Sequence, residues 1–161
     1  MKVIDNFLSD YYFKRIESFF MGDQIPWYYK NNTVREGDGK SIFTTSILQN
    51  GSSERNDELF SIIEPCIQKL GCKSLFRIKA NCELPTFFHR KTEYHIDLPF
   101  DPPIKTSIYY VNTNNGWTHI KGHGKVKSVA NRMVTFDSNQ YHAGVTCTNE
   151  ERRVVVNFNW K

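Results

Sequence analysis

Two histidines and an aspartate are the residues of this 161-residue sequence that are best suited to bind a metal ion. His95 and Asp97 are separated by one residue, and His142 follows further along the chain. In an extended strand, residues i and i+2 project from the same face, so His95 and Asp97 can both point at one ion while Ile96 turns away. A third ligand from elsewhere would complete a set that leaves the opposite coordination positions open. A histidine–aspartate hydrogen bond on a strand is the alternative for the His-x-Asp pattern alone.

The segment around His142 favours the metal site. Residues 131–160 predict a strand, a turn with His142, a loop, and a last strand that opens at an arginine. Alternation along that strand puts Arg153 on the face of Val155, Asn157 and Asn159, and Arg152 on the face of Val154, Val156, Phe158 and Trp160. The second face is apolar and suits packing against helices. We therefore expect Arg153 to face the pocket, with Arg152 as the alternative.

The other histidines and the cysteines predict no second metal site. His119 and His123 stand in THIKGHG, where Gly122 and Gly124 favour a hairpin turn over converging ligands. His89 lies in the loop before the His-x-Asp segment and is expected to be exposed. None of the cysteines forms a CxxC pair, so reduced thiols are expected at Cys66, Cys72, Cys82 and Cys147.

Helical patterns dominate the first part of the chain. Ser9 is a candidate N-cap, and an apolar stripe follows at Tyr12, Phe13, Ile16, Phe19 and Phe20. A second helix is predicted over 57–70, ended by Gly71, with a kink or break at Pro65. The polar residues 31–41 between them predict a mobile loop.

Short strands dominate from residue 74 onward. Residues 76–82 alternate, with Arg77, Lys79 and Asn81 on the polar face, and residues 105–112 are β-branched and aromatic. Further strands are predicted at 117–120, 125–130, 132–137 and 152–160. Many short strands with two supporting helices predict a mainly β jelly roll.

Composition places few constraints on partners. The formal net charge is +4 and the basic residues are scattered, so nucleic-acid binding is not favoured. No segment reaches the roughly 20 apolar residues of a membrane span, and the N-terminus is a poor signal peptide. We expect a cytoplasmic protein, in the host cytoplasm if it is virus-encoded. The sequence specifies no oligomeric state.

Together these features resemble the 2-oxoglutarate/Fe(II)-dependent oxygenase superfamily, nearest its prolyl-4-hydroxylase-like branch and small phage-type members. The family signature is His-x-Asp, a distal histidine and then arginine or lysine, which matches His95, Asp97, His142 and Arg153 in order. The segments SIYYVN (107–112) and RVVVNFNW (153–160) read like its strands, and the match covers roughly 74–160. The resemblance implies a double-stranded β-helix with two or more N-terminal helices packed on its outer sheet. Residues 1–161 would form one domain. Within it, residues 1–73 would provide the supporting helices and a loop, and residues 74–161 would form the β-helix.

Site roles follow from the same resemblance. It implies that His95, Asp97 and His142 bind iron(II), and that Arg153 pairs with the distal carboxylate of 2-oxoglutarate, for which a guanidinium fork is suited. Tyr110 would donate its hydroxyl to that cosubstrate, with Ile108 lining the same face. A buried aromatic is the alternative role for Tyr110. On the polar face of its strand, Asn81 is a candidate contact to cosubstrate or substrate, and Arg77 and Lys79 on the same face are candidates for substrate contact.

The implied activity is a dioxygenase that uses iron(II), 2-oxoglutarate and dioxygen, hydroxylates a small molecule or peptide, and releases succinate and CO₂. Its substrate determinants are expected in loops 31–41 and 83–92. Three alternatives remain: a cupin-like metalloenzyme that binds no 2-oxoglutarate, a catalytically silent jelly-roll binding or structural module, and a nucleic-acid demethylase of the same superfamily. The first of these has no need for Arg153.

Overall fold

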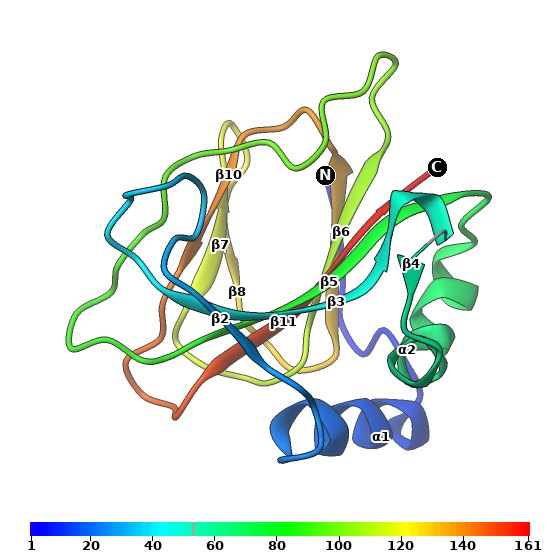
Figure 1. Ribbon diagram of the computed structural model, residues 1–161, viewed down its shortest axis with the longest axis horizontal. Coiled ribbons are helices and arrows are strands. Elements are labelled where there is room, and N and C mark those ends of the chain that lie inside the picture. Colours follow the sequence, from blue (N-terminus) through cyan, green and yellow to red (C-terminus); the bar gives the residue numbers. More distant parts are fainter. Residues whose placement is uncertain (53) are drawn as a thin grey trace.

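Two antiparallel sheets carry most of the chain in the computed structural model, which describes residues 1–52 and 54–161 (Figure 1). The larger sheet contains β1 (Lys2–Ile4), β2 (Tyr28–Lys30), β3 (Ile42–Gln49), β4 (Glu54–Arg55), β5 (Leu75–Glu83), β6 (Lys105–Tyr110), β9 (Arg132–Asp137) and β11 (Arg153–Trp160). Its order is β1-β9-β6-β11-β5-β3-β2, and β4 pairs with β3. The smaller sheet has the order β10-β7-β8 and contains β7 (Trp117–Ile120), β8 (Gly124–Lys127) and β10 (His142–Val145). This mainly β architecture fits the predicted jelly roll.

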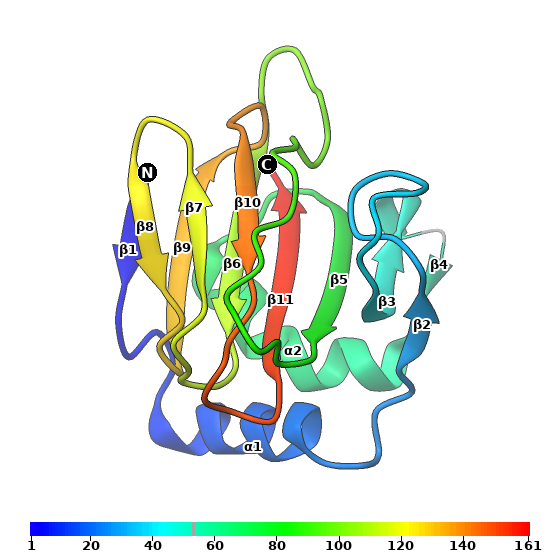
Figure 2. The ribbon, with the colours of Figure 1, turned by 90° about the vertical axis from the view of Figure 1, so that its left-hand side faces the viewer.

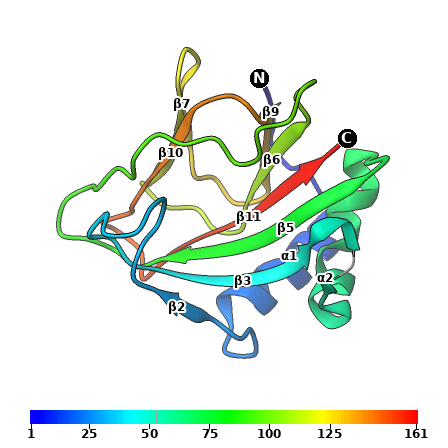
Figure 3. The same cartoon turned by 45° about the horizontal axis from the view of Figure 1, so that its top comes forward.

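Two helices, α1 (Asp10–Met21) and α2 (Asp57–Leu70), lie on the side of the larger sheet that faces away from β7, β8 and β10 (Figures 1 and 3). Their apolar stripes and one face of the sheet form a single buried cluster. Burying one large aliphatic or aromatic side chain contributes about 1.5–3 kcal/mol, so this layer holds the sheet rigidly from outside. The cluster includes Phe13, Ile16, Phe20, Leu59, Ile63, Ile78, Tyr109, Val154, Val156 and Phe158.

Pro65 does not break α2, contrary to the sequence-based expectation of a kink or break there. The helix runs from Asp57 to Leu70, with the Asn56 side chain accepting a hydrogen bond from the Leu59 N–H and Gly71 left-handed at φ 69°. A proline has no N–H to donate to the carbonyl four residues earlier, here that of Ser61. Because Ser61 is exposed, water can satisfy its carbonyl, and the helix continues.

The predicted strands agree with β5, β6, β7, β8, β9 and β11 to within a few residues. The strands β1, β2, β3, β4 and β10 were not predicted. The predicted loop 31–41 connects β2 to β3. Part of it is internally hydrogen-bonded, because the Asp38 carboxylate accepts bonds from the backbone N–H groups of Thr33, Val34 and Lys40. No helix in the described ranges has the length and apolar character needed to cross a bilayer.

Strand pairing joins the polar faces of three neighbouring strands. Lys79 lies opposite Asn157 of β11 and Ser46 of β3, and Asn81 lies opposite Thr44 of β3. Directly opposed residues of paired strands share a face of the sheet. The larger sheet therefore has an apolar face toward the helices, while on β3, β5 and part of β11 the opposite face carries polar side chains. The smaller sheet lies on that second side (Figure 2).

Candidate metal centre

The three predicted ligands come together between the two sheets. His142 is the first residue of β10, and it exchanges two backbone hydrogen bonds with His95, at 3.0 and 2.9 Å. His95 and Asp97 lie outside the regular strands, so the prediction that an extended strand carries the His-x-Asp pair was wrong. An isolated bridge to β10 positions His95 instead. Ile96, which was expected to turn away, lines the same cavity.

The spacing of the three side chains suits one ion. Their ligand atoms all lie within 4.8 Å of one another. Asp97 Oδ1 lies 3.9 Å from His142 Nε2 and 4.0 Å from His95 Nε2. Ligand bonds from histidine nitrogen or carboxylate oxygen to a divalent ion such as zinc are about 2.0–2.2 Å long, so donors about 4 Å apart can reach one ion. A small inward movement would give a facial set of two histidines and one carboxylate.

Backbone carbonyls orient both histidine rings. The Nδ1 atom of His142 lies 3.1 Å from the carbonyl oxygen of Gln140, and that of His95 lies 3.2 Å from the carbonyl oxygen of Glu93. A protonated Nδ1 that donates to these carbonyls leaves Nε2 unprotonated in the neutral ring, as a metal ligand requires. Burial lowers the pKa of His142, which favours this neutral form although Asp97 opposes it.

Asp97 is held as a buried carboxylate. Its side chain is 6% exposed, with Arg77 Nη2 2.9 Å from Oδ1 and the Asn159 Nδ2 donating to Oδ2 at 3.2 Å. Burial alone would raise the pKa of Asp97, but His142, Arg77 and His95 outweigh it and keep that pKa below its usual value. The group is therefore ionised and ready to bind a cation. Arg77, which the sequence suggested as a substrate contact, lies against this candidate metal ligand.

A cavity of about 340 Å³ opens beside the triad. Residues of both sheets line it, and besides the triad five site candidates from the sequence are among them: Arg77, Lys79, Asn81, Ile108 and Arg153. Thr33, Glu83 and Thr92 also line it and lie in the segments 31–41 and 83–92 that were expected to determine the substrate. The sequence did not indicate Lys30, Ile42, Thr118 and Gly144, which line the cavity as well. The volume suits a small organic molecule beside a metal ion.

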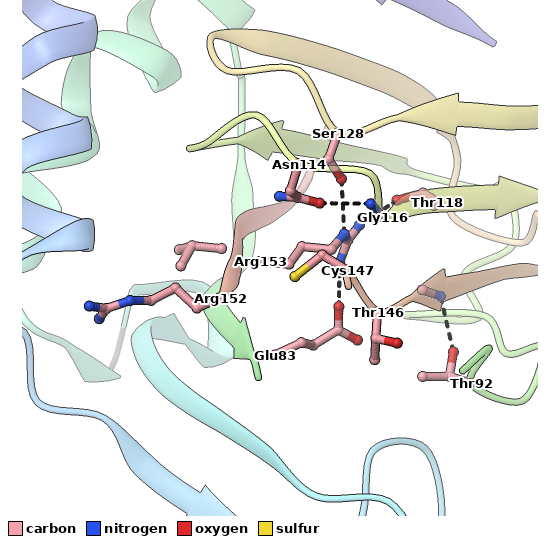
Figure 4. Close-up of polar contacts among 12 residues, drawn as sticks. Glu83, Thr92, Asn114, Gly116, Thr118, Ser128, Thr146, Cys147, Arg152 and Arg153 are labelled. Carbon is pink, nitrogen blue, oxygen red and sulfur yellow. Dashed lines mark hydrogen bonds and ion pairs between the residues drawn. The ribbon is translucent and has the colours of Figure 1, made fainter. Parts of the chain in front are cut away.

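Arg153 lies at the inner end of this cavity and is almost fully buried (Figure 4). Its Nη1 lies 2.6 Å from Glu83 Oε2, its Nε donates to Ser128 Oγ at 3.0 Å, and its Nη2 donates to Thr118 Oγ1 at 3.1 Å. Arg152 points away from this cluster in Figure 4 and does not line the cavity. Alternation along the strand thus distinguished the two arginines correctly.

Unsatisfied polar atoms in the cavity wall and behind it fit a polar ligand. Asn81 Oδ1 and Asn157 Oδ1 are buried with no hydrogen-bond partner among the described residues. Tyr110 is fully buried next to the Arg153 guanidinium, 5.8 Å from ring centroid to Cζ, and lies behind the cavity wall. Its hydroxyl makes no hydrogen bond of good geometry, although the nearby Thr118 hydroxyl interacts with it. Burial raises the pKa of Tyr110, so it is a neutral donor.

The residues present therefore fit iron(II) at the triad. They fit a dicarboxylate cosubstrate at Arg153 on the condition that it displaces Glu83 or shares the guanidinium with it. Every nitrogen of the Arg153 guanidinium is already engaged, and one partner is the carboxylate of Glu83. The sequence could have indicated Glu83, since it continues the polar alternation of Arg77, Lys79 and Asn81 on β5. Alternation placed Asn159 on the cavity face of its strand but did not indicate its contact with Asp97. Nothing local indicated Thr118 or Ser128.

The remaining histidines and cysteines take structural positions. His119 and His123 belong to the β7–β8 hairpin, as predicted, and His119 Nδ1 lies 2.7 Å from the Tyr94 hydroxyl. The exposed His89 lies 2.7 Å, through Nδ1, from the Thr146 carbonyl oxygen. Among the residues that the structure describes, the triad is the one group of histidine, cysteine or acidic side chains suited to a metal. All four cysteines are free.

Comparison with known proteins finds similarity to solved structures alone. No protein-family model and no curated protein matches the sequence. A 2OG-Fe(II) oxygenase family oxidoreductase from Burkholderia pseudomallei superposes with a TM-score of 0.70 and 11% identity, over 98% of this chain and 84% of that one. For a Pseudomonas putida prolyl-4-hydroxylase, the TM-score is 0.63 and the identity 15%, over 99% and 91% of the two chains.

A third match shows that proteins described differently from the oxygenases also have a similar fold. A cupin-like protein from Thermotoga maritima superposes with a TM-score of 0.51 and 10% identity, over 86% of this chain and 81% of that one. At such identities the matches establish the fold. The chain has the jelly-roll fold of the 2OG-Fe(II) oxygenase family and its prolyl hydroxylases, as the resemblance in its sequence predicted.

Proposed function

We propose that this protein is a prolyl-hydroxylase-like, Fe(II)- and 2-oxoglutarate-dependent dioxygenase that hydroxylates a substrate and releases succinate and CO₂. One observation carries the proposal: two histidines and a buried carboxylate meet at a cavity whose inner end presents the Arg153 guanidinium. When bound, the iron and 2-oxoglutarate would supply the oxidising chemistry with dioxygen. We propose that residues 1–161 act as one domain, in the cytoplasm.

The chain's own residues would bind and position these groups. His95, Asp97 and His142 would hold the iron, and the pairing of Asn159 with Asp97 Oδ2 leaves Oδ1 turned toward both histidines. Arg153 would hold the distal carboxylate of 2-oxoglutarate, assisted by the Thr118 hydroxyl. This places the cosubstrate between the two sheets, where most of its surface is removed from water.

The apolar side of the same cavity supports this arrangement. Ile108 and Val155 line it and belong to a buried cluster between the sheets. They would pack against the carbon chain of the cosubstrate and exclude water from the Arg153 end. The Tyr110 hydroxyl, without a good partner among the described residues, is a candidate donor to the cosubstrate there. Asn81 would contact the cosubstrate through its amide nitrogen, because its Oδ1 can only accept a hydrogen bond. The roles of Tyr110, Ile108 and Asn81 rest on this proximity and on the family resemblance.

Anaerobic titration of the metal-free protein with Fe(II) and 2-oxoglutarate tests the proposal. We expect the weak visible charge-transfer band of a metal-chelated 2-oxo acid, and succinate formation once oxygen is admitted. Asp97→Ala should abolish both the band and succinate formation. His119→Ala, a histidine outside the triad, is the matched control and should retain them. A band and turnover of wild-type size in Asp97→Ala would refute the triad assignment.

A cupin-like metalloenzyme without 2-oxoglutarate is the second candidate, and the Glu83–Arg153 pair favours it. That ion pair satisfies the guanidinium within the protein itself, with both side chains less than 10% exposed. Under this alternative the triad binds a metal ion, while 2-oxoglutarate fails to bind at millimolar concentration. Calorimetric titration of the Mn(II)-loaded protein with 2-oxoglutarate distinguishes the two functions.

A further inference from the structure

Three basic side chains form one wall between the metal centre and an adjoining cavity. Lys30 of β2 and Arg77 and Lys79 of β5 line both the cavity beside the triad and a second one of about 370 Å³. Arg77 is engaged by Asp97 and by Asn159, whose Oδ1 accepts from its Nε at 3.0 Å. Lys30 and Lys79 continue the positive wall away from the triad.

Neither lysine has an acidic partner. Within the described part of the chain, Lys30 and Lys79 form no ion pair and no hydrogen bond with another side chain. Burial lowers the pKa of Lys79 to about 8, and repulsion from Lys30 and Arg77 adds to the effect, while attraction by Asp97 only partly opposes it. A protein rarely leaves a half-buried ammonium without a counter-charge. An anionic ligand that paired with the half-buried Lys79 and the exposed Lys30 beside it would supply this counter-charge.

Hydroxyl groups accompany the two lysines. Ser46 lies opposite Lys79 and Thr44 opposite Asn81 on the neighbouring strand β3, and both line the second cavity. Tyr28, on β2, lies opposite Thr44 and also lines it. These donors, with two ammonium groups, provide an array for an acceptor that has several oxygens. We call Lys30, Thr44, Ser46 and Lys79 the cationic groove.

We propose that the cationic groove binds a phosphate monoester group of the substrate, so that the protein oxidises a small phosphorylated molecule. A phosphate monoester carries about −1.5 to −2 charges at pH 7 and several acceptor oxygens. Two unpaired ammonium groups match that charge, whereas a single carboxylate would neutralise only one of them. The inference rests on the proposed oxygenase function, since it concerns the substrate of the same site.

Binding to the metal-free protein tests the groove apart from the metal. Inorganic phosphate and methyl phosphate are titrated into EDTA-treated protein and followed by calorimetry, with succinate as the carboxylate probe. We expect both phosphates to bind in the millimolar range or tighter, and Lys30→Gln and Lys79→Gln each to weaken binding about tenfold. Lys127→Gln, an exposed lysine on β8, is the matched control and should bind like wild type. Thermal unfolding of each variant establishes that it is folded.

The outcomes separate this inference from the proposed function. Equal phosphate affinity in wild type and both groove variants would overturn the phosphate site, as would tighter binding of succinate at the same lysines. A single-stranded oligonucleotide that binds more tightly than methyl phosphate, with strong salt dependence, would also overturn it and favour the demethylase alternative. Mn(II) binding by the triad is measured separately. Phosphate binding without Mn(II) binding would refute the oxygenase alone, and the converse would refute the groove alone.

Discussion

Glu83 Oε2 lies 2.6 Å from Arg153 Nη1, and both side chains are less than 10% exposed. The residue proposed to anchor the cosubstrate thus already holds a carboxylate that belongs to the protein. The two residues lie directly opposite each other on β5 and β11, so the pairing of these strands fixes them together. A dicarboxylate that enters the cavity would have to displace Glu83 or share the guanidinium with it.

Replacing Glu83 with Gln should therefore strengthen 2-oxoglutarate binding. The substitution keeps the shape and one acceptor but removes the negative charge that competes for Arg153. We expect the Kd for 2-oxoglutarate, measured by calorimetry on the Mn(II)-loaded protein, to fall by about tenfold. The same change should lower the Tm by roughly 3–8 °C, because a buried guanidinium loses its counter-charge.

Glu93→Gln is the matched control for this prediction. Glu93 also pairs with an arginine, Arg35, but the pair is exposed at the surface. Its loss should change neither the Tm nor the affinity measurably, since exposed ion pairs contribute little. Unchanged or weaker 2-oxoglutarate binding in Glu83→Gln would show that the two carboxylates do not compete.

The two side chains that hold Asp97 should affect metal affinity in opposite directions. Asn159 donates to Oδ2 and orients the carboxylate, so Asn159→Ala should weaken Mn(II) binding about tenfold or more. Arg77 instead contacts Oδ1, the oxygen nearest both histidines, and repels a cation. Arg77→Gln should therefore tighten Mn(II) binding severalfold. Calorimetry measures both, and weakening by both variants would show that Arg77 serves only to orient Asp97.

Lys79→Met should stabilise the protein at neutral pH. The folded-state pKa of Lys79, about 8, lies below the unfolded value of about 10.4, so unfolding takes up a proton between these values. Stability of the wild type therefore rises with pH across this window. The methionine keeps the apolar stem but no charge, and we expect a gain of about 1–2 kcal/mol at pH 7 after allowance for partial exposure. Urea unfolding should show this advantage shrinking by pH 10, and an advantage that is equal at both pH values would contradict it.

Gly116→Ala should disturb the Arg153 cluster directly. A Cβ at this position would lie 2.7 Å from the Val145 carbonyl oxygen and 2.8 Å from Arg153 Cδ. Relief of these contacts must shift the backbone or the arginine, which costs about 1–3 kcal/mol. We expect a lower Tm and weaker 2-oxoglutarate binding. Gly122→Ala, strained at φ 83° but with open space around its Cβ, should lower the Tm alone. Equal 2-oxoglutarate affinity in the two variants would rule out a positioning effect of Gly116.

The sequence predicted those elements whose formation depends on residues close together in the chain. The second helix was predicted with its exact span and its Gly71 end, because both the apolar stripe and the left-handed glycine are written in consecutive residues. Alternation also placed Arg153 on the cavity face and Arg152 off it. The failure at Pro65 has a different source. Whether a lost hydrogen bond ends a helix depends on solvent access to the freed carbonyl, which only the packed structure reveals.

The contacts that the sequence did not indicate are those between strands far apart in the chain. Glu83 meets Arg153, and Asn159 meets Asp97, only because β5, β11 and the His-x-Asp segment are neighbours in space. A strand's own residues show which side chains share a face, but they carry no information about which strand lies beside it or in which register. The sequence placed Lys79 on a polar strand face but did not indicate the cationic groove, because Lys30, Thr44 and Ser46 belong to strands that were not predicted.

The position of β11 also governs when the site can form during synthesis. This strand, Arg153–Trp160, lies between β6 and β5 in the centre of the larger sheet. The earlier strands cannot close the sheet across that place, so a nascent chain still lacking these residues has two separated halves with exposed edges. The cavity beside the triad therefore cannot be complete before β11 has paired with β5 and β6, because Arg153 and Val155 of this strand line it.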